Sequence, residues 1–150
     1  MEKNEKRSVD ELMDYYNGHV SIVKLQRYGH RCGYVRVNDH ELFKRIAKWY
    51  ESWSEEFDFD VHGGITFVLS DSDKEYLPEG DWIGFDCDHL GDAIDVTALF
   101  NNFNISDAEF SLVVERFKLG KGGKIRSTEY VCKECHSLID QLIKLGDKRL

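Results

Sequence analysis

The chain has 150 residues, of which 41% are hydrophobic and 13% aromatic, a composition that excludes a disordered chain. The length is too short for two ordinary cores, so we predict one domain over residues 1–150. Twenty-eight acidic residues outnumber 20 basic ones, and the formal net charge of -8 disfavours nonspecific binding to nucleic acid or anionic membranes.

The amino-terminal segment, Met1 to Asp10, is charged and is not followed by an apolar stretch, so we expect neither a signal peptide nor a transit peptide. No apolar run approaches the length that spans a membrane. Four cysteines in a chain without an export signal predict reduced thiols. The cytoplasm of a bacterial cell is therefore the expected location.

The first predicted elements are a helix and a strand pair. Ser8 to Glu11 follows the capping-box pattern, which predicts a short helix that ends at Gly18. Val20 to Leu25 and Cys32 to Val37 are rich in strand-forming residues and flank a turn that contains Gly29. We predict that these two runs form a hairpin.

A second capping pattern, Asn38 to Glu41, predicts a helix with one side facing the core. Its apolar residues recur at three- and four-residue spacings, namely Leu42, Phe43, Ile46, Trp49, Tyr50 and Trp53. Apolar and polar residues then alternate from Phe57 to His62, and an apolar run from Ile65 to Leu69 follows the pair Gly63-Gly64. This pattern predicts a bulged or bent strand.

The remaining predicted elements are one strand and two helices. Trp82 to Cys87 is the strand, and Ser106 to Glu109 caps a helix whose core residues are expected to be Phe110, Val113, Val114 and Phe117. The last helix, from about Thr128 to Leu145, has an apolar face of Val131, Cys135, Leu138, Ile139 and Leu142. Helices around a mainly antiparallel sheet predict a two-layer α+β fold.

Side chains able to perform chemistry gather at two predicted strand ends. His62 comes directly before Gly63-Gly64, where backbone without a Cβ can approach a ligand closely. The strand that begins at Trp82 ends near Asp86, and the loop beyond it carries His89 and Asp92. If the two strands are neighbours, the four polar side chains converge.

Two kinds of chemistry suit such a set. Imidazole and carboxylate groups bind zinc, manganese or iron, so His62, Asp86, His89 and Asp92 are candidate ligands of a divalent metal. Without a metal, His62 or His89 beside Asp86 would act as a general acid or base. Hydrogen bonds that only shape the loop would explain the same residues.

Two other motifs suggest ligands but lack the context that such sites need. Cys132 to His136 has the Cys-x-x-Cys-His spacing, yet the chain has no export signal and no second cysteine pair, and Cys135 falls on the apolar helix face. Lys118 to Lys124 lacks the Gly-Lys-Ser/Thr ending of a phosphate-binding loop. We interpret the first as a structural helix segment and the second as a solvated loop.

Acidic residues form a second type of candidate site. Glu55, Glu56, Asp58 and Asp60 lie in one short run, whose field would attract a basic, nucleic-acid-binding surface of another protein. A merely soluble, solvated surface is the alternative explanation of the same charge. Trp82 is a further candidate for binding, because its ring could stack on a nucleotide.

Several blocks in combination resemble a family of small phage and prophage proteins. The blocks are Gly29 to Val35, His40, Asp60 to Phe67, Trp82 to Asp92, Glu129 to Val131 and Glu134-Cys135, and the resemblance extends from Gly29 to Leu142. Members of this family mostly lack an assigned function, so the resemblance implies a phage habitat. The chain departs from the family at Asn38 to Leu42, where a Pro-x-Gly-His-Pro-type segment is usual. Additional sequence at Asp71 to Gly80 and Asn101 to Gly123 could form a specialised partner surface.

Two functional hypotheses follow from these patterns. The first is a phage-type accessory protein, with counter-defence as one such role, that binds a host protein through its acidic surface. The second is a small hydrolase, metal-assisted or of the His/Asp acid-base type, that acts on a nucleotide or nucleic-acid phosphate through His62, Asp86 and His89.

Overall fold

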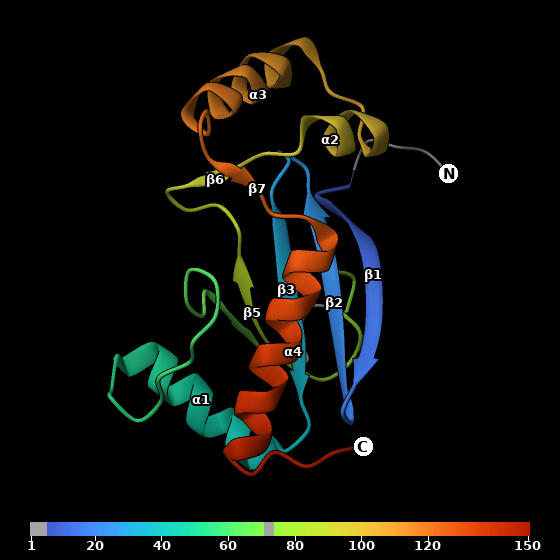
Figure 1. The fold of residues 1–150 in the computed structure, drawn as a ribbon. Helices are drawn as coiled ribbons and strands as arrows, with labels where there is room; N and C mark the ends of the chain where they lie inside the picture. Colours follow the sequence, from blue (N-terminus) through green and yellow to red (C-terminus); the bar gives the residue numbers. More distant parts are fainter. Residues whose placement is uncertain (1–5, 71–73) are drawn as a thin grey trace.

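The structure is a computed structural model that describes residues 6–70 and 74–150. Five strands form an antiparallel sheet in the order β1-β2-β3-β5-β4 (Figure 1). Their bounds are Ser8–Tyr16 for β1, His19–Gln26 for β2, Arg31–Val37 for β3, Phe67–Leu69 for β4 and Asp81–Asp86 for β5. A separate two-stranded parallel pair joins β6 (Asp92–Ala93) to β7 (Lys124–Ile125).

Four helices complete the described part of the chain, namely α1 (His40–Ser52), α2 (Val96–Asn102), α3 (Asp107–Leu119) and α4 (Thr128–Lys144). The long helix α4 lies across one face of the sheet, while α2 and α3 extend beyond one end of it (Figure 1). The predicted α+β class with a mainly antiparallel sheet is confirmed. Among the described residues, no helix is both long and apolar enough to cross a membrane.

The main core lies between α4 and the sheet. The buried face of α4 consists of the five residues that the helical periodicity predicts: Val131, Cys135, Leu138, Ile139 and Leu142. They pack with inward-facing strand residues such as Val23, Val35, Ile83 and Phe85. Gly33 makes this close approach possible, because a Cβ there would lie 2.6 Å from the Phe85 ring and 2.8 Å from the Cys135 sulfur.

The helix predicted from Ser8 to Gly18 is wrong, because this segment is the edge strand β1. Asn17 and Gly18 both have positive φ angles, of 50° and 82°, and form the tight turn between β1 and β2. Asn-Gly is a strong hairpin signal, and pairing along β2 outweighs the local capping pattern. A bulge at Glu11 interrupts the pairing, and the Glu11 carboxylate accepts hydrogen bonds from Arg31.

The bulged strand predicted from Phe57 to Leu69 is also largely wrong, since only Phe67–Leu69 is strand. The α4 side chains replace a neighbouring strand as hydrogen-bond partners of this segment. Gln141 both donates to and accepts from the Asp60 backbone at 2.8 Å, and Glu134 accepts from the His62 N–H at 2.8 Å. The backbone groups of Asp60 and the His62 N–H are therefore satisfied without sheet pairing.

The predicted hairpin of β2 and β3 and the predicted helices α1, α3 and α4 are confirmed, and α3 has the expected capping box at Ser106 and Glu109. Some core assignments on α1 and α3 are wrong. Tyr50 and Trp53 of the predicted α1 face are exposed, and on α3 only Val113 is buried, whereas Phe110 and Phe117 are exposed. Local periodicity on α3 overstates its burial because the helix extends beyond the sheet (Figure 1).

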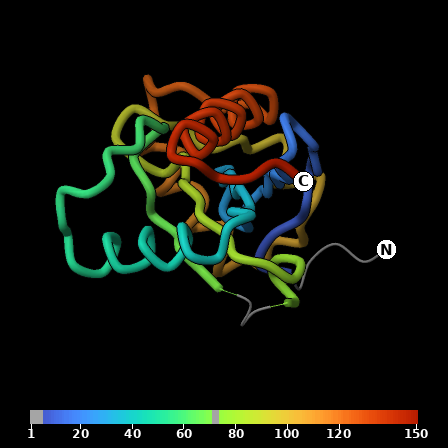
Figure 2. The backbone as a smooth tube through the Cα atoms, turned by 90° about the horizontal axis from the view of Figure 1, so that it is seen from below, coloured from blue at the N-terminus to red at the C-terminus, as the bar shows by residue number. Residues whose placement is uncertain are grey.

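The chain after α4 turns back to the hairpin of β1 and β2 (Figure 2). There the Leu150 N–H donates to the Gly18 carbonyl at 3.0 Å. The buried carboxylate of Asp147 lies 2.7 Å from His19 Nε2 and accepts from the backbone N–H groups of Asn38 and Asp39. This carboxylate thus fastens β2, the start of α1 and the carboxy-terminal segment to one another.

The close packing at Gly33 leads to a stability prediction. Gly33→Ala should lower the free energy of unfolding by about 1–3 kcal/mol, because the added methyl group must displace the Phe85 ring and the Cys135 sulfur. Urea denaturation followed by circular dichroism measures this change. Ser111→Ala, at an exposed position on α3, serves as the control and should change stability by less than about 0.5 kcal/mol. Equal stability of Gly33→Ala and the wild type would contradict the packing described.

Candidate functional site

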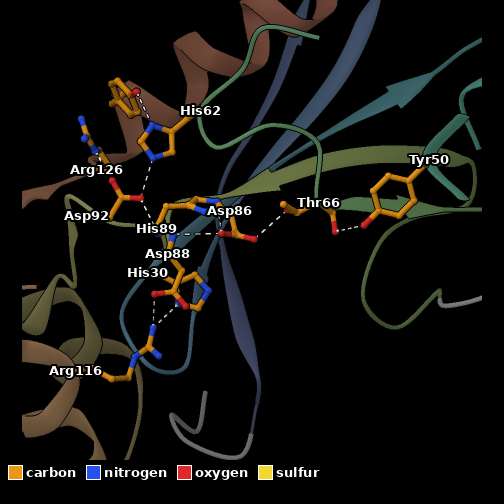
Figure 3. Close-up of polar contacts among 11 residues, drawn as sticks. His30, Tyr50, His62, Thr66, Asp86, Asp88, His89, Asp92, Arg116 and Arg126 are labelled. Carbon is orange, nitrogen blue, oxygen red and sulfur yellow. Dashed lines mark hydrogen bonds and ion pairs between the residues drawn. The ribbon is translucent and has the colours of Figure 1, made fainter. Parts of the chain in front are cut away.

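A group of polar residues, which we call the polar zone, lies where β3 begins and β5 ends, beside the start of α4 and the end of α3 (Figure 3). It contains His30, His62, Asp86, Asp88, His89, Asp92, Arg116 and Arg126. The structure thus brings the four sequence-predicted residues of the site into one region. It also adds His30, Asp88, Arg116 and Arg126 to them.

His62 and Asp92 form the more buried of two histidine–aspartate pairs. His62 Nε2 lies 2.8 Å from Asp92 Oδ2, and His62 Nδ1 lies 2.8 Å from the Tyr130 hydroxyl. Arg126 donates to the other Asp92 oxygen at 2.7 Å, and the His89 backbone N–H donates to Asp92 Oδ2 at 3.1 Å. Both ring nitrogens of His62 therefore have partners, which fixes the orientation of the imidazole.

Hydrogen bonding determines the ionisation of the Asp92 carboxyl. Burial alone would raise its pKa, but the hydrogen bonds from His62, Arg126 and the His89 N–H outweigh this effect and lower the pKa below its ordinary value. Burial raises the pKa of Tyr130, so this phenol is not activated as a nucleophile. The Tyr130–His62–Asp92 chain is therefore built to hold the His62 loop on α4.

His89 and Asp86 form the second pair, which is more accessible to solvent. His89 Nε2 lies 3.0 Å from Asp86 Oδ1, and the Thr66 hydroxyl donates to Asp86 Oδ2 at 2.9 Å. The Asp88 N–H also donates to Asp86. An imidazole oriented by a carboxylate is one arrangement that can perform general acid-base chemistry.

The third group of contacts in the zone involves residues that the sequence did not single out. Arg116 of α3 donates to Asp88 at 2.7 Å and lies 3.4 Å from His30 Nδ1. Burial lowers the pKa of His30, so its ring favours the neutral form. The positions of these residues in the chain give no local signal, because His30 and Arg116 are 86 residues apart and meet only in the folded protein.

The predicted metal ligands do not converge on one point. His62 pairs with Asp92 and His89 pairs with Asp86, and the two imidazole centroids are 6.2 Å apart. Within residues 6–70 and 74–150, only Asp14, Cys132 and His136 bring three metal-ligating atoms within 4.8 Å of one another. The imidazoles of His62 and His89 are thus each paired with a separate carboxylate.

The acidic candidates lie in a different part of the molecule, after α1. We call residues 53–60 the acidic loop; the carboxylate residues Glu55, Glu56, Asp58 and Asp60 are exposed on it. Trp53, at the start of the loop, is 90% exposed. A hollow of about 210 Å³ lies between this loop and α4, and it is lined by Glu56, Phe57, Asp58, Phe59, Gln141, Lys144 and Leu145.

Trp82, the remaining predicted binding residue, lies in the interior. Its side chain is 1% exposed, packs with Ile22 and Tyr34, and donates from Nε1 to the Pro78 carbonyl at 2.9 Å. The predicted contact of its ring with a nucleotide is therefore wrong for this folded state, since a partner cannot reach a buried ring. Alternation along β5 directs Trp82 to the sheet face that α4 does not cover, where residues 76 and 77 close over it.

The two segments that the family resemblance predicts as additional, residues 71–80 and 101–123, differ in secondary structure. Residues 71–73 of the first lie outside the described residues, and Lys74 to Pro78 line a hollow of about 780 Å³ with Lys6, Arg7, Lys24 and the start of β1. The second segment, Asn101 to Gly123, contains α3. An ion pair from Glu109 to Arg27, with 2.7 Å between Oε2 and Nε, ties α3 to the end of the sheet.

The lowered pKa of Asp92 gives a prediction with a defined sign. The ionised carboxylate stabilises the fold fully above the ordinary pKa of about 4, and this stabilisation is lost as the pH falls through the lower pKa of the folded state. Asp92→Asn should therefore destabilise the protein by about 2 kcal/mol at pH 7 and by clearly less near pH ~3. Urea denaturation at the two pH values, with exposed Asp58→Asn as the control, measures the difference. A pH-independent loss would contradict the assigned role.

Comparison with known proteins identifies no family or relative for this chain. No family model matches the chain, and no curated protein or solved structure matches it either. The resemblance to small phage and prophage proteins therefore stays a prediction.

Proposed function

We propose that this protein is a phage-type accessory protein that binds a basic surface of a host protein through its acidic loop. The observation that carries the proposal concerns Trp53. Its large aromatic side chain is 90% exposed, and its backbone has a strained, positive φ angle. The carboxylates that follow it define the charge of the expected partner. A role in countering host defence is one use of such binding.

The backbone of Trp53 makes its exposure informative. Trp53 ends α1 in the left-handed conformation, with φ of 57° and ψ of 33°, and its N–H donates to the Trp49 carbonyl. Glycine is the usual residue at such helix ends, because a side chain there costs about 1 kcal/mol or more. A tryptophan that is both strained and solvent-exposed lowers stability without contributing to the core. Selection for contact with a partner explains why it stands there.

The surroundings of Trp53 favour a basic partner. Glu55, Asp58 and Asp60 are exposed in the same loop, so their charges are available for long-range attraction. Glu56 is partly neutralised by Arg45, whose Nη2 lies 2.6 Å from its carboxylate. Lysine and arginine bind both carboxylates and the faces of aromatic rings, so the loop offers two matching interactions to such side chains.

The hollow beside the loop could receive one such side chain. Phe57 and Phe59 stack with ring centroids 5.6 Å apart, and Glu56 and Asp58 alternate with them. The carboxylates of Glu56 and Asp58 outnumber the one basic lining residue, Lys144, so the hollow suits the aliphatic stem and charged end of a lysine or arginine. Gln141 secures the loop to α4 through the Asp60 backbone, so the surface needs little ordering upon binding.

Replacing Trp53 by glycine separates function from stability. Trp53→Gly should raise the free energy of unfolding by about 1 kcal/mol, because it removes the left-handed strain. The same variant should bind the partner on the order of 30-fold more weakly, since exposed tryptophans are frequent hot spots of interfaces. A host protein retained from bacterial lysate by the wild type would be identified by mass spectrometry, purified and titrated against each variant.

Matched controls test whether this loop is the binding surface. Phe117→Ala removes an exposed aromatic side chain from α3 and should leave the affinity unchanged. Glu55→Lys should slow association and reduce its salt dependence, whereas Glu115→Lys, with the same charge change on α3, should have a smaller effect. Equal affinity of Trp53→Gly and the wild type for every retained partner would contradict the proposal.

The accessible pair of His89 and Asp86 favours a second candidate function, hydrolysis of a nucleotide or nucleic-acid phosphate by acid-base chemistry. Asp86 is oriented by Thr66, and His89 Nε2 lies 3.0 Å from it. In a screen of phosphomonoesters and phosphodiesters, turnover by the wild type should fall about 100-fold or more in His89→Gln. His40→Gln, at an exposed histidine paired with Asp81, is the matched control. Turnover that is absent, or equal in both variants, would exclude this function for the pair.

A further inference from the structure

The cluster of Asp14, Cys132 and His136 lies outside both the polar zone and the acidic loop. Cys132 and His136 are four residues apart on α4, so their side chains lie on one face of the helix. That face is turned toward the edge strand β1, which contributes Asp14. Cys135, the other cysteine of the Cys-x-x-Cys-His string, is completely buried beneath the helix and takes no part.

The distances between the three ligating atoms are close to those of a tetrahedral metal site. The Cys132 sulfur lies 3.6 Å from His136 Nε2 and 3.7 Å from Asp14 Oδ2. Ligands at ordinary zinc distances on the corners of a tetrahedron are separated by roughly 3.3–3.6 Å. The third distance, 2.6 Å between His136 Nε2 and Asp14 Oδ2, is that of a hydrogen bond and would open by roughly 0.7 Å around an ion.

The surroundings hold the imidazole in a fixed orientation. The Tyr16 ring stacks on the His136 ring with centroids 4.0 Å apart and an angle of 11° between the planes. The Tyr16 hydroxyl in turn donates to Asp140 at 3.1 Å, one turn further along α4. Tyr16 and Asp14 are two residues apart on β1 and so share a face of the strand. Preorganised ligands of this kind lower the ordering cost of binding an ion.

We propose that Asp14, Cys132 and His136 bind a divalent transition metal, with zinc as the best match to one sulfur, one nitrogen and one oxygen ligand. All three side chains are half-buried, so the fourth coordination position would face solvent and be filled by water. On binding, the Cys132 thiol forms the metal–sulfur bond and releases its proton to solvent. The His136 proton moves to Nδ1, which leaves Nε2 free to coordinate.

A hydrogen-bonded His136–Asp14 pair with a thiol beside it is the alternative explanation, and cobalt spectroscopy distinguishes the two. The chelator-treated full-length protein is titrated with Co²⁺, and the thiolate-to-cobalt charge-transfer absorption is recorded. The proposal predicts one Co²⁺ per chain, with an absorption that Zn²⁺ abolishes by displacement. Absence of this absorption in the wild type would overturn the proposal.

Substitutions test which residues are the metal ligands. Cys132→Ser should lose the charge-transfer absorption, and His136→Gln and Asp14→Asn should weaken Co²⁺ binding about tenfold or more. His62→Gln should retain both the absorption and the affinity, because His62 belongs to the polar zone. Urea denaturation of the metal-free variants establishes that each is folded. Cys135→Ala should retain the absorption. The assignment would be overturned if Cys132→Ser kept the absorption. It would also be overturned if folded Cys135→Ala or folded His62→Gln lost it.

Discussion

The packing of α4 on the sheet is the constraint on which the rest of the structure depends. Because Gly33 has no side chain, α4 approaches the strands closely. The side of the helix that carries Cys135 therefore covers Phe85. The exposed sides of the same helix then position features that are far apart in the sequence. Glu134 and Gln141 hold the backbone of residues 60–62, and Tyr130 contacts His62. The acidic loop, the His62–Asp92 pair and the proposed metal site therefore depend on one helix whose position is determined by the core.

The polar zone and the acidic loop differ in how their charges are arranged. In the polar zone carboxylates are matched by histidine or arginine at hydrogen-bond distance, as in the pairs of Asp92 with Arg126 and Asp88 with Arg116. Such pairing orients side chains and fastens loops. In the acidic loop, by contrast, Glu55, Asp58 and Asp60 form no ion pair with any of the described residues, and the adjacent Trp53 is exposed. Unmatched charge beside an exposed aromatic ring is suited to a partner, which is why the loop carries the proposed function.

Most of the fold follows from local patterns, and the exceptions have physical causes. Periodicity predicts α1 and α4, because their buried faces repeat as an amphipathic helix requires. It fails for β1, where the Asn17-Gly18 turn and pairing with β2 outweigh a capping pattern. It fails again at residues 57–66, where the backbone groups of Asp60 and His62 bond to α4 side chains instead of to a strand. The sequence also places His62, Asp86, His89 and Asp92 in one region, but which imidazole pairs with which carboxylate depends on tertiary geometry. Trp53 shows the limit of periodicity most clearly, since it continues the apolar stripe of α1 but lies beyond the last turn that the core covers.

Site-specific photo-crosslinking in bacterial cells tests the central claim most directly. A photoreactive amino acid would replace Ser54, an exposed residue beside the intact Trp53, in one variant and the exposed Phe117 of α3 in another, so that both surfaces are sampled under identical conditions. The account predicts that a host protein with a basic surface is crosslinked from position 54 and not from position 117, and that high salt reduces the yield. Crosslinking from position 117 alone, or from neither position, would contradict the role of the acidic loop.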